Sequence, residues 1–210
     1  MARDEFGRRL EDIEARVIEL FALVADDLPR AGDALLGGAL DAARLVAERE
    51  LAVDSLCGQV VDLVARDILL QAPVASDLRF LLSVLRVAPE IERSHDLVMQ
   101  ITSRADAALG GELSPRAREL SGQISDQTSD MWGHAAQAWY GRDRAAAPVL
   151  AGCAEELGRL HAGLTAELAT GRMALPAVME MTVVAHCYRR LGAHAVNITR
   201  RVAYLAGAAA

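Results

Sequence analysis

Residues 71–102, QAPVASDLRFLLSVLRVAPEIERSHDLVMQIT, contain a turn signal followed by a long helical pattern. Pro73 cannot continue a preceding helix, so a chain break is expected there. From Leu78 to Met99, apolar side chains recur at steps of three and four residues, which is the spacing of an amphipathic helix. The same spacing extends along almost the whole chain, and we find no convincing alternation of the kind that predicts a strand. The sequence therefore predicts an all-α fold.

Glycine and proline residues mark where the helices are expected to end. A glycine pair that begins at Gly110 falls near the middle of the chain and divides the helical pattern into two groups. Ser114 and Pro115 then predict a helix start, because serine caps the first turn and proline is favoured at its first position. We expect two similar three-helix bundles in tandem. They are expected over residues 1–108 and 112–210, and their six helices over residues 3–36, 40–70, 74–107, 114–140, 144–170 and 174–206.

The two halves also share sequence features. A shift of 97 positions places Arg93 on Arg190 and Arg104 on Arg201. A proline opens the third helix of each half. Together with the repeated layout of three helices, these matches indicate an internal duplication.

The composition excludes several classes of protein. All 22 basic residues are arginine, whereas a phosphate-binding P-loop requires a lysine. The net charge of −7 argues against a general nucleic-acid-binding protein, which needs a basic face. No Ser–His–Asp or Cys–His arrangement and no glycine-rich nucleotide loop supports catalysis. The acids are unevenly spread, since residues 1–108 hold 20 of the 29 acidic residues but only 12 of the 22 arginines.

The sequence also predicts where the protein is found. No stretch is long and apolar enough for a membrane helix, and the first residues lack the apolar segment of a signal peptide. The three cysteines, Cys57, Cys153 and Cys187, have no CxxC spacing and lie in apolar helical patterns. We expect them to be buried free thiols, as is usual in a reducing compartment. A cytoplasmic protein is therefore predicted.

Four carboxylates interrupt the apolar stripes of the second and third expected helices. Glu50 and Asp54 lie four residues apart in one stripe, and Glu92 and Asp96 in the other. Side chains with this spacing project from one face of a helix. Carboxylates that face a core repel each other and are costly to bury, so they require a cation. Oxygen ligands at this density suit magnesium, manganese or iron, and zinc is a further candidate.

Two other interpretations of these acids stay open. In the first, the stripe is rotated and the acids are solvated or paired with arginine, for which Arg49 and Arg93 are neighbouring candidates. In the second, Glu92 and His95 form the ExxH motif of ferritin-like di-iron bundles, with the acids of the second expected helix as further ligands. The chain would then be a carboxylate-bridged di-iron oxidase or a metal-storage protein. Because such a site takes two ExxH motifs and only one is present, a chance match is favoured.

The segment Gln71–Arg79, QAPVASDLR, followed by Glu92-Arg-Ser-His-Asp96, resembles the QPVAxDLR and ERxxD signature of the PhoU phosphate-signalling regulators. Gly192–Ile198, GAHAVNI, is similar to the repeated GDHAVNI of that family. The resemblance extends over essentially the whole chain. It implies an all-α fold of two similar three-helix bundles, in a cytoplasmic protein that is not an enzyme.

The resemblance also implies partners and a cofactor. Members of the family restrain phosphate-starvation signalling by linking the ATPase subunit of a phosphate ABC transporter to a phosphate-sensing histidine kinase. They reach the membrane only through these partners and often form homodimers. Several carry polynuclear metal clusters held by paired E(D)xxxD motifs, which Glu50–Asp54 and Glu92–Asp96 match. The acid of the signature, Asp77, is a candidate for an additional metal ligand.

The second half departs from the pattern of the family. Where the family has an acid pair in the last helix, this chain has Arg189 and Ala193. The corresponding positions of the fifth expected helix are about Ala154 and Gly158. A metal site is therefore expected only in the first bundle. The nearby His161, His186 and His194 are expected to pack through hydrogen bonds rather than bind a metal. His194 stands at the usual histidine position of the family.

Overall fold

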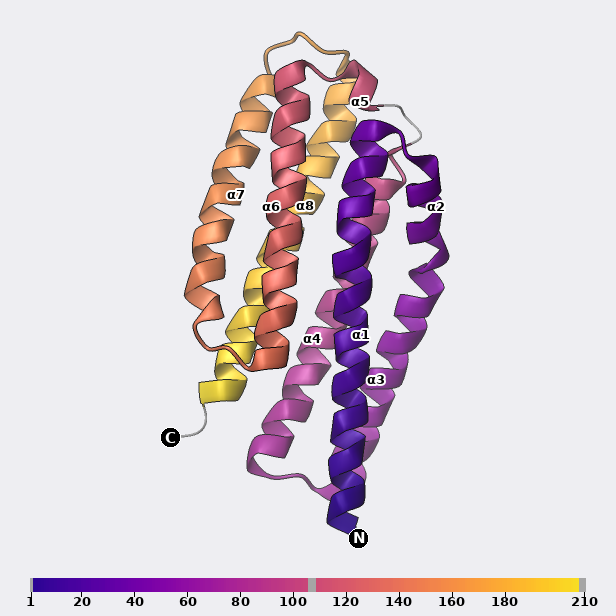
Figure 1. Ribbon diagram of the computed structural model, residues 1–210, viewed down its shortest axis with the longest axis vertical. Coiled ribbons are helices and arrows are strands. Elements are labelled where there is room, and N and C mark those ends of the chain that lie inside the picture. The colour runs from indigo at the N-terminus through magenta and orange to yellow at the C-terminus, as the bar shows by residue number, and fades with distance from the viewer. Residues whose placement is uncertain (1, 106–108, 208–210) are drawn as a thin grey trace.

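The structure is a computed structural model that describes residues 2–105 and 109–207, and it is helical almost throughout (Figure 1). No strand is present in these described ranges, so the all-α prediction is confirmed. The helices are α1 (Ala2–Gly37), α2 (Leu40–Glu48), α3 (Glu50–Gln71), α4 (Ala75–Thr102), α5 (Leu109–Glu112), α6 (Pro115–Gly141), α7 (Ala146–Leu168) and α8 (Leu175–Gly207).

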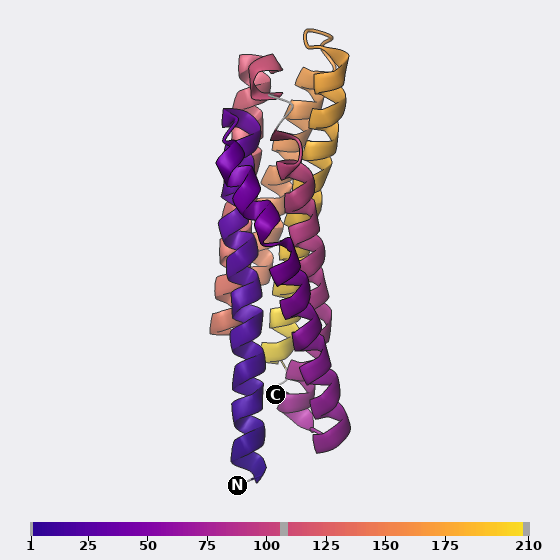
Figure 2. The same cartoon turned by 90° about the vertical axis from the view of Figure 1, so that its right-hand side faces the viewer.

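The long helices pack in two groups of three. Helices α1, α3 and α4 pack against one another and form what we call the first bundle, and α6, α7 and α8 form the second bundle. Helix α1 also packs against α6, and α4 packs against α8. The two bundles therefore lie side by side along their lengths, and the molecule is elongated in both views (Figures 1 and 2). This arrangement agrees with the predicted pair of three-helix bundles.

The single helix expected over residues 40–70 is wrong, because the chain forms two helices that meet at Arg49. At the break the N–H of Arg49 donates to the carbonyl oxygen of Val46 at 3.1 Å, which closes a tighter turn than an α-helical hydrogen bond. The side chain of Arg49 donates to the carboxylate of Asp27 in α1 at 2.7 Å. The break is thus tied to α1 by an arginine that reaches inward.

The connection between the bundles also differs from the expectation. Helix α4 ends at Thr102, earlier than expected, and the short helix α5 was not predicted. Positions 106 and 107 of the expected helix and the expected domain boundary at 108 lie outside the described residues. Gly110 in α5 lies against the end of α1, where a Cβ atom would overlap the carbonyl oxygen of Leu36. Only glycine therefore fits at this close approach.

The predicted start of α6 is confirmed. The hydroxyl of Ser114 accepts a hydrogen bond from the backbone N–H of Ala117 at 3.1 Å, and Pro115 occupies the first turn. The side chain therefore satisfies one of the N–H groups that a helix start leaves unpaired.

An aromatic cluster joins the two bundles. Phe21 of α1 lies 6.3 Å from Trp132 and 6.1 Å from Trp139 of α6, measured between ring centroids. Phe80 of α4 lies 6.4 Å from Trp139. These rings belong to one continuous apolar core that contains residues of both bundles. Burying such large rings is a major source of stability.

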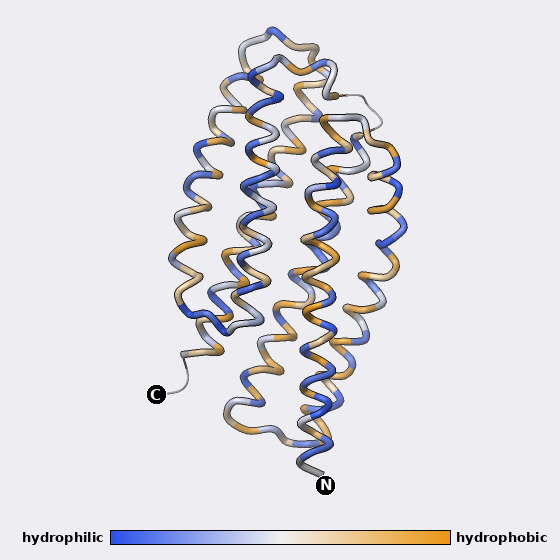
Figure 3. Tube along the Cα trace, in the orientation of Figure 1, coloured by the Kyte–Doolittle hydropathy of each residue, from blue (hydrophilic) through white to orange (hydrophobic). Residues whose placement is uncertain are grey.

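Hydropathy alternates along each of the long helices. Figure 3 shows hydrophilic and hydrophobic residues interleaved in both bundles, as expected for helices that bury one face. Within the described residues, no helix combines the length and the apolar character that crossing a membrane would require.

Candidate metal centre

The four predicted carboxylates lie at the outer edge where α3 and α4 meet, not in the core. Glu50, Asp54 and Asp96 are exposed, and Glu92 is partly buried. The expectation that they face a core is therefore wrong. The buried stripe of α3 includes Val53 but not the neighbouring Asp54, and it consists of Val53, Leu56, Cys57, Val60, Val64 and Asp67. A shift of one residue turns a helix by about 100°, which moves the acids to the side of the stripe.

The structure nevertheless brings the acids of the two helices together. The thiol of Cys57 on α3 donates to Oε2 of Glu92 on α4 at 3.1 Å. Burial, this hydrogen bond and the negative charge of Glu92 and Asp54 raise the pKa of Cys57 to about 12. The pKa of Asp96 is also raised, first by burial and then by the charges of Asp54, Glu92 and Glu50. Each acid therefore lies within electrostatic range of the others.

The arginines that were candidates to neutralise these acids are engaged elsewhere. Arg49 lies 2.7 Å from Asp27, and Arg93 lies 2.8 Å from Glu90. The pairing of Arg49 and Arg93 with the four acids is therefore wrong, whereas the rotated stripe with solvated acids agrees with the exposure of Glu50, Asp54 and Asp96. In the part of the chain that the structure describes, Asp54 and Asp96 have no ion-pair partner. The negative charge of Asp54 and Asp96 is therefore not compensated by a cationic side chain among the described residues.

The four carboxylates are suitable metal ligands by chemical type, but their side chains are not arranged around a common point. Four carboxylates offer the hard oxygen ligands that magnesium, manganese and iron prefer. Among residues 2–105 and 109–207, however, no three Cys, His, Asp or Glu side chains converge closely enough to hold one ion. Binding would therefore require rotation of these exposed side chains, whose χ angles are free to change in solvent.

Asp77 is not part of this cluster. It lies near the first turn of α4, fifteen positions before Glu92 on the same helix. At 1.5 Å of rise per residue the two are about 22 Å apart, too far to share an ion. Asp77 instead lines a pocket with Glu14 and Arg142, near the start of α1. The structure therefore separates this candidate ligand from the other four.

His95 lies in the interior rather than beside the acids. Its Nε2 is 3.3 Å from Oδ2 of Asp27, and both side chains are fully buried. The ExxH motif therefore does not present both Glu92 and His95 to a common ligand. This placement removes the observation on which the di-iron alternative rested.

The buried acid that organises this region was missed from the sequence. Asp27 is 0% exposed and contacts His95 as well as Arg49 and Arg30, the latter at 3.4 Å. It therefore joins α1, the break between α2 and α3, and α4. In the sequence it follows Asp26 and resembles one of a pair of surface acids, so no local signal marks it as buried.

The equivalent edge of the second bundle is cationic. Arg189 and Ala193, which replace the expected acid pair, are both exposed. Nη2 of Arg189 lies 3.5 Å from Nδ1 of His186. Burial and the neighbouring charges of Arg189 and His186 lower the pKa of His161. This edge has the opposite electrostatic character from the cluster on α3 and α4.

The packing role predicted for His194 is confirmed. Its Nδ1 lies 2.8 Å from the hydroxyl of Ser94, and its ring is largely buried between α8 and α4. Burial lowers the pKa of His194 below its ordinary value of 6.5, and the charges of Arg190 and Arg93 lower it further, whereas Glu90 opposes them. The neutral ring is therefore the form that the folded protein favours.

This shift predicts how stability depends on pH. Below about pH 6.5 the unfolded chain binds a proton at His194 that the folded chain resists, so wild type loses stability as the pH falls. In His194→Gln this contribution is absent, and we expect a smaller loss between about pH 7.5 and about pH 5.5. Urea unfolding of both proteins at the two pH values measures the difference. Equal losses would show that His194 does not resist protonation.

The prediction of free thiols is also borne out. Cys57 and Cys187 are buried, Cys153 is partly buried, and all three are unpaired.

Comparison with known proteins links this fold to a family. A sequence model of the PhoU domain matches residues 17–105. A curated relative, the phosphate-specific transport system accessory protein PhoU homolog of Pseudomonas aeruginosa, is 25% identical, and the match covers 96% of this chain and 85% of the relative.

Two solved structures have the same fold. The crystal structure of PhoU from Pseudomonas aeruginosa superposes with a TM-score of 0.89 at 25% identity and covers 95% of this chain and 98% of that one. The phosphate transport system regulatory protein PhoU from Streptococcus pneumoniae superposes with a TM-score of 0.85 at 22% identity, covering 95% and 96%. The family model thus identifies a PhoU domain over residues 17–105, and the similarity to PhoU proteins extends over both bundles.

Proposed function

We propose that the protein is an accessory regulator of phosphate transport that restrains the phosphate-starvation response. It acts by contact with the ATPase subunit of the phosphate ABC transporter and with a phosphate-sensing histidine kinase. The observation that carries this proposal is the match over nearly the full length of both chains to PhoU of Pseudomonas aeruginosa. A cytoplasmic location and a homodimeric state are part of the same proposal, and both rest on the family resemblance.

We further propose that the first bundle holds a metal. Glu50 and Asp54 on α3 and Glu92 and Asp96 on α4 would supply the ligands, after rotation of their side chains. A bound cation would offset the repulsion that raises the pKa of Asp96. It would also brace α3 against α4 at the edge where the break at Arg49 begins. The protein would then regulate without catalysing a reaction, because the metal-bound surface would bind a partner with a different affinity from the metal-free one.

Two measurements on one pair of variants test the proposal. We expect roughly stoichiometric metal in the wild type by elemental mass spectrometry, and a loss to background in Glu92→Ala/Asp96→Ala. The matched control is Asp126→Ala/Asp130→Ala, which removes two exposed acids with the same spacing from α6 and should retain the metal. Wild type purified without chelator and free of metal would overturn the metal proposal.

The regulatory proposal has its own readout. In the host that encodes this chain, deletion of the gene is expected to raise expression of a phosphate-starvation reporter in phosphate-rich medium, and the wild-type gene should restore repression. Failure of the deletion to change the reporter would contradict the regulatory role, whatever the metal content. Repression by Glu92→Ala/Asp96→Ala then tells whether the metal is needed for regulation.

A further inference from the structure

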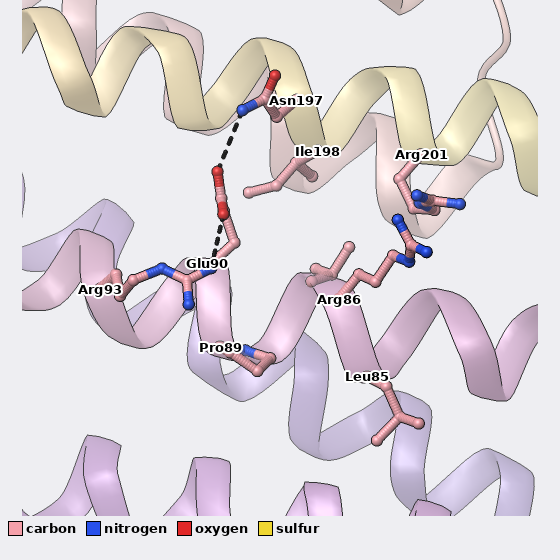
Figure 4. A pocket seen from close by; sticks show the side chains of 9 residues that line it. Leu85, Arg86, Pro89, Glu90, Arg93, Asn197, Ile198 and Arg201 are labelled. Carbon is pink, nitrogen blue, oxygen red and sulfur yellow. Dashed lines mark hydrogen bonds and ion pairs between the residues drawn. The ribbon is translucent and has the colours of Figure 1, made fainter.

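A groove of about 490 Å³ runs between α4 and α8 (Figure 4). Its polar lining consists of Arg86, Glu90 and Arg93 from α4 and Asn197 and Arg201 from α8. Three cationic side chains thus share the groove with one acid. Arg86, Glu90 and Arg201 were not identified from the sequence as part of a site.

Glu90, the acid of the groove, is hydrogen-bonded to Arg93 and Asn197. Arg93 donates to Oε2 of Glu90 at 2.8 Å, and Asn197 donates to Oε1 at 3.3 Å (Figure 4). Burial alone would raise the pKa of Glu90, but the hydrogen bonds from Arg93 and Asn197 and the charge of Arg93 bring it below its ordinary value. Glu90 is therefore ionised, and its charge is used to neutralise Arg93.

The other two arginines are not neutralised. Arg86 and Arg201 point toward one another across the groove in Figure 4. Arg201 stacks over the ring of Tyr204 at 5.0 Å, which fixes its direction without cancelling its charge. Among the described residues, neither guanidinium has a hydrogen-bond or ion-pair partner. Like charges that face one another repel, and the repulsion is relieved by an anion between them.

The internal duplication shows that this interface is approximately two-fold symmetric. The shift of 97 positions that relates α4 to α8 also relates their contacts. Asn197 contacts Glu90, and the equivalent residues, Gln100 and Cys187, are also in contact, with Oε1 and Sγ 3.8 Å apart. Each end of the interface can therefore be compared with the other, position by position.

The comparison shows what one end lacks. Arg104, the equivalent of Arg201, forms an ion pair with Glu180 at 2.7 Å. At the equivalent of Glu180, the end with the groove has the neutral Ser83, so Arg201 loses its acid. At the equivalent of Val183 it has Arg86, so a second positive charge is added. One end is neutralised within the protein, and the other carries two unpaired arginines.

We infer that the Arg86–Arg201 end of the groove binds a dianionic tetrahedral oxyanion of the phosphate type. Two guanidinium forks offer parallel N–H donors to several oxygens at once, which suits a tetrahedral anion with two charges better than a halide. The groove is larger than one such anion, so a phosphate that is free and a phosphate carried on a small organic group both fit. This inference does not depend on the metal or on the partners proposed above.

Isothermal titration calorimetry of the purified full-length protein at constant ionic strength tests the inference. The probes are inorganic phosphate and glycerol 3-phosphate, with chloride as the reference anion. We expect saturable binding of at least one phosphate probe, and binding about tenfold weaker or more in Arg86→Glu and in Arg201→Ser. Arg86→Glu should fold normally, because it recreates an ion pair like that between Arg104 and Glu180. The comparison of the two probes identifies the source of the anion.

The control is Arg66→Glu, which makes the same charge change at an exposed position of α3 and should leave binding unchanged. Three results would overturn the inference: no saturable heat with either phosphate probe, equal binding of chloride, or equal weakening in Arg66→Glu. Either of the last two results would mean that the anion binds because of the overall charge of the protein and not at the Arg86–Arg201 pair. The assay uses no transporter, kinase or metal, so its failure is distinct from failure of the proposed function.

Discussion

Replacing Asp27 with alanine is expected to lower the free energy of unfolding by about 3 kcal/mol. The carboxylate is fully buried, and Arg49 and Arg30 point at one of its oxygens while His95 points at the other. Removing one partner of a buried ion pair leaves the charge of the others uncompensated. This typically lowers the free energy of unfolding by roughly 3–5 kcal/mol. Both arginines are partly exposed and can turn to water, so the lower end of that range is expected here.

Asp26→Ala is the matched control for this change. Asp26 precedes Asp27, is exposed, and lies 3.6 Å from Arg30 and 3.8 Å from Arg49. Exposed ion pairs contribute less than about 1 kcal/mol, so this variant should unfold almost like the wild type. Urea unfolding followed by far-ultraviolet circular dichroism measures both. Similar losses in the two variants would show that the buried carboxylate contributes no more than the exposed one.

Asp27→Ala should also affect the candidate metal centre. Asp27 holds Arg49, which occupies the break immediately before Glu50. When Arg49 is released, the start of α3 loses its anchor to α1, and the acids of α3 are no longer held in register with those of α4. This link connects a stability change in the core to a site on the surface.

Trp132→Ala is expected to cost about 4 kcal/mol of unfolding free energy. The indole is fully buried, packs on Phe21 of the other bundle, and donates from Nε1 to the carbonyl oxygen of Leu191 at 3.1 Å. Truncation removes the buried ring together with its hydrogen bond and opens a cavity. Unfolding is again followed by circular dichroism, because the substitution changes the tryptophan fluorescence.

Tyr140→Ala provides the comparison for an aromatic residue that is not buried. Tyr140 lies on the same helix and is 74% exposed, so its loss should change stability by less than about 0.5 kcal/mol. Trp132→Phe retains most of the ring but not the hydrogen bond, and should fall between the two. A cost for Trp132→Ala no larger than that for Tyr140→Ala would contradict the role of the cluster.

The fold could be predicted because its signals are local. Apolar spacing identifies helices, and glycine, proline and the serine cap at Ser114 identify where they begin and end. The break at Arg49 could not be predicted in this way, because its partner, Asp27, is 22 residues away in α1. Nothing in the sequence around Arg49 distinguishes an arginine that reaches inward from one that is solvated.

The sequence predicted which acids group together in the candidate site, but not whether they are buried. Steps of three and four residues can be followed along two neighbouring lines of the same helix, and only packing decides which line is buried. On α3 the buried line includes Val53 and Val60, whereas the predicted line included Asp54. The acids were therefore grouped correctly and placed in the core wrongly. The groove was missed because Arg86 and Arg201 lie on different helices, and only the packing of α4 on α8 brings them together.

The aromatic cluster that joins the bundles has a thermodynamic consequence. In the terms used for repeat proteins, stability divides into what each repeat contributes alone and what neighbouring repeats gain by contact. Here Phe21 and Phe80 of one repeat are buried against Trp132 and Trp139 of the other, so the interface contribution is large. A half expressed alone would expose these rings to water. The duplicated halves therefore fold and unfold as one cooperative unit, and damage to either is shared by both.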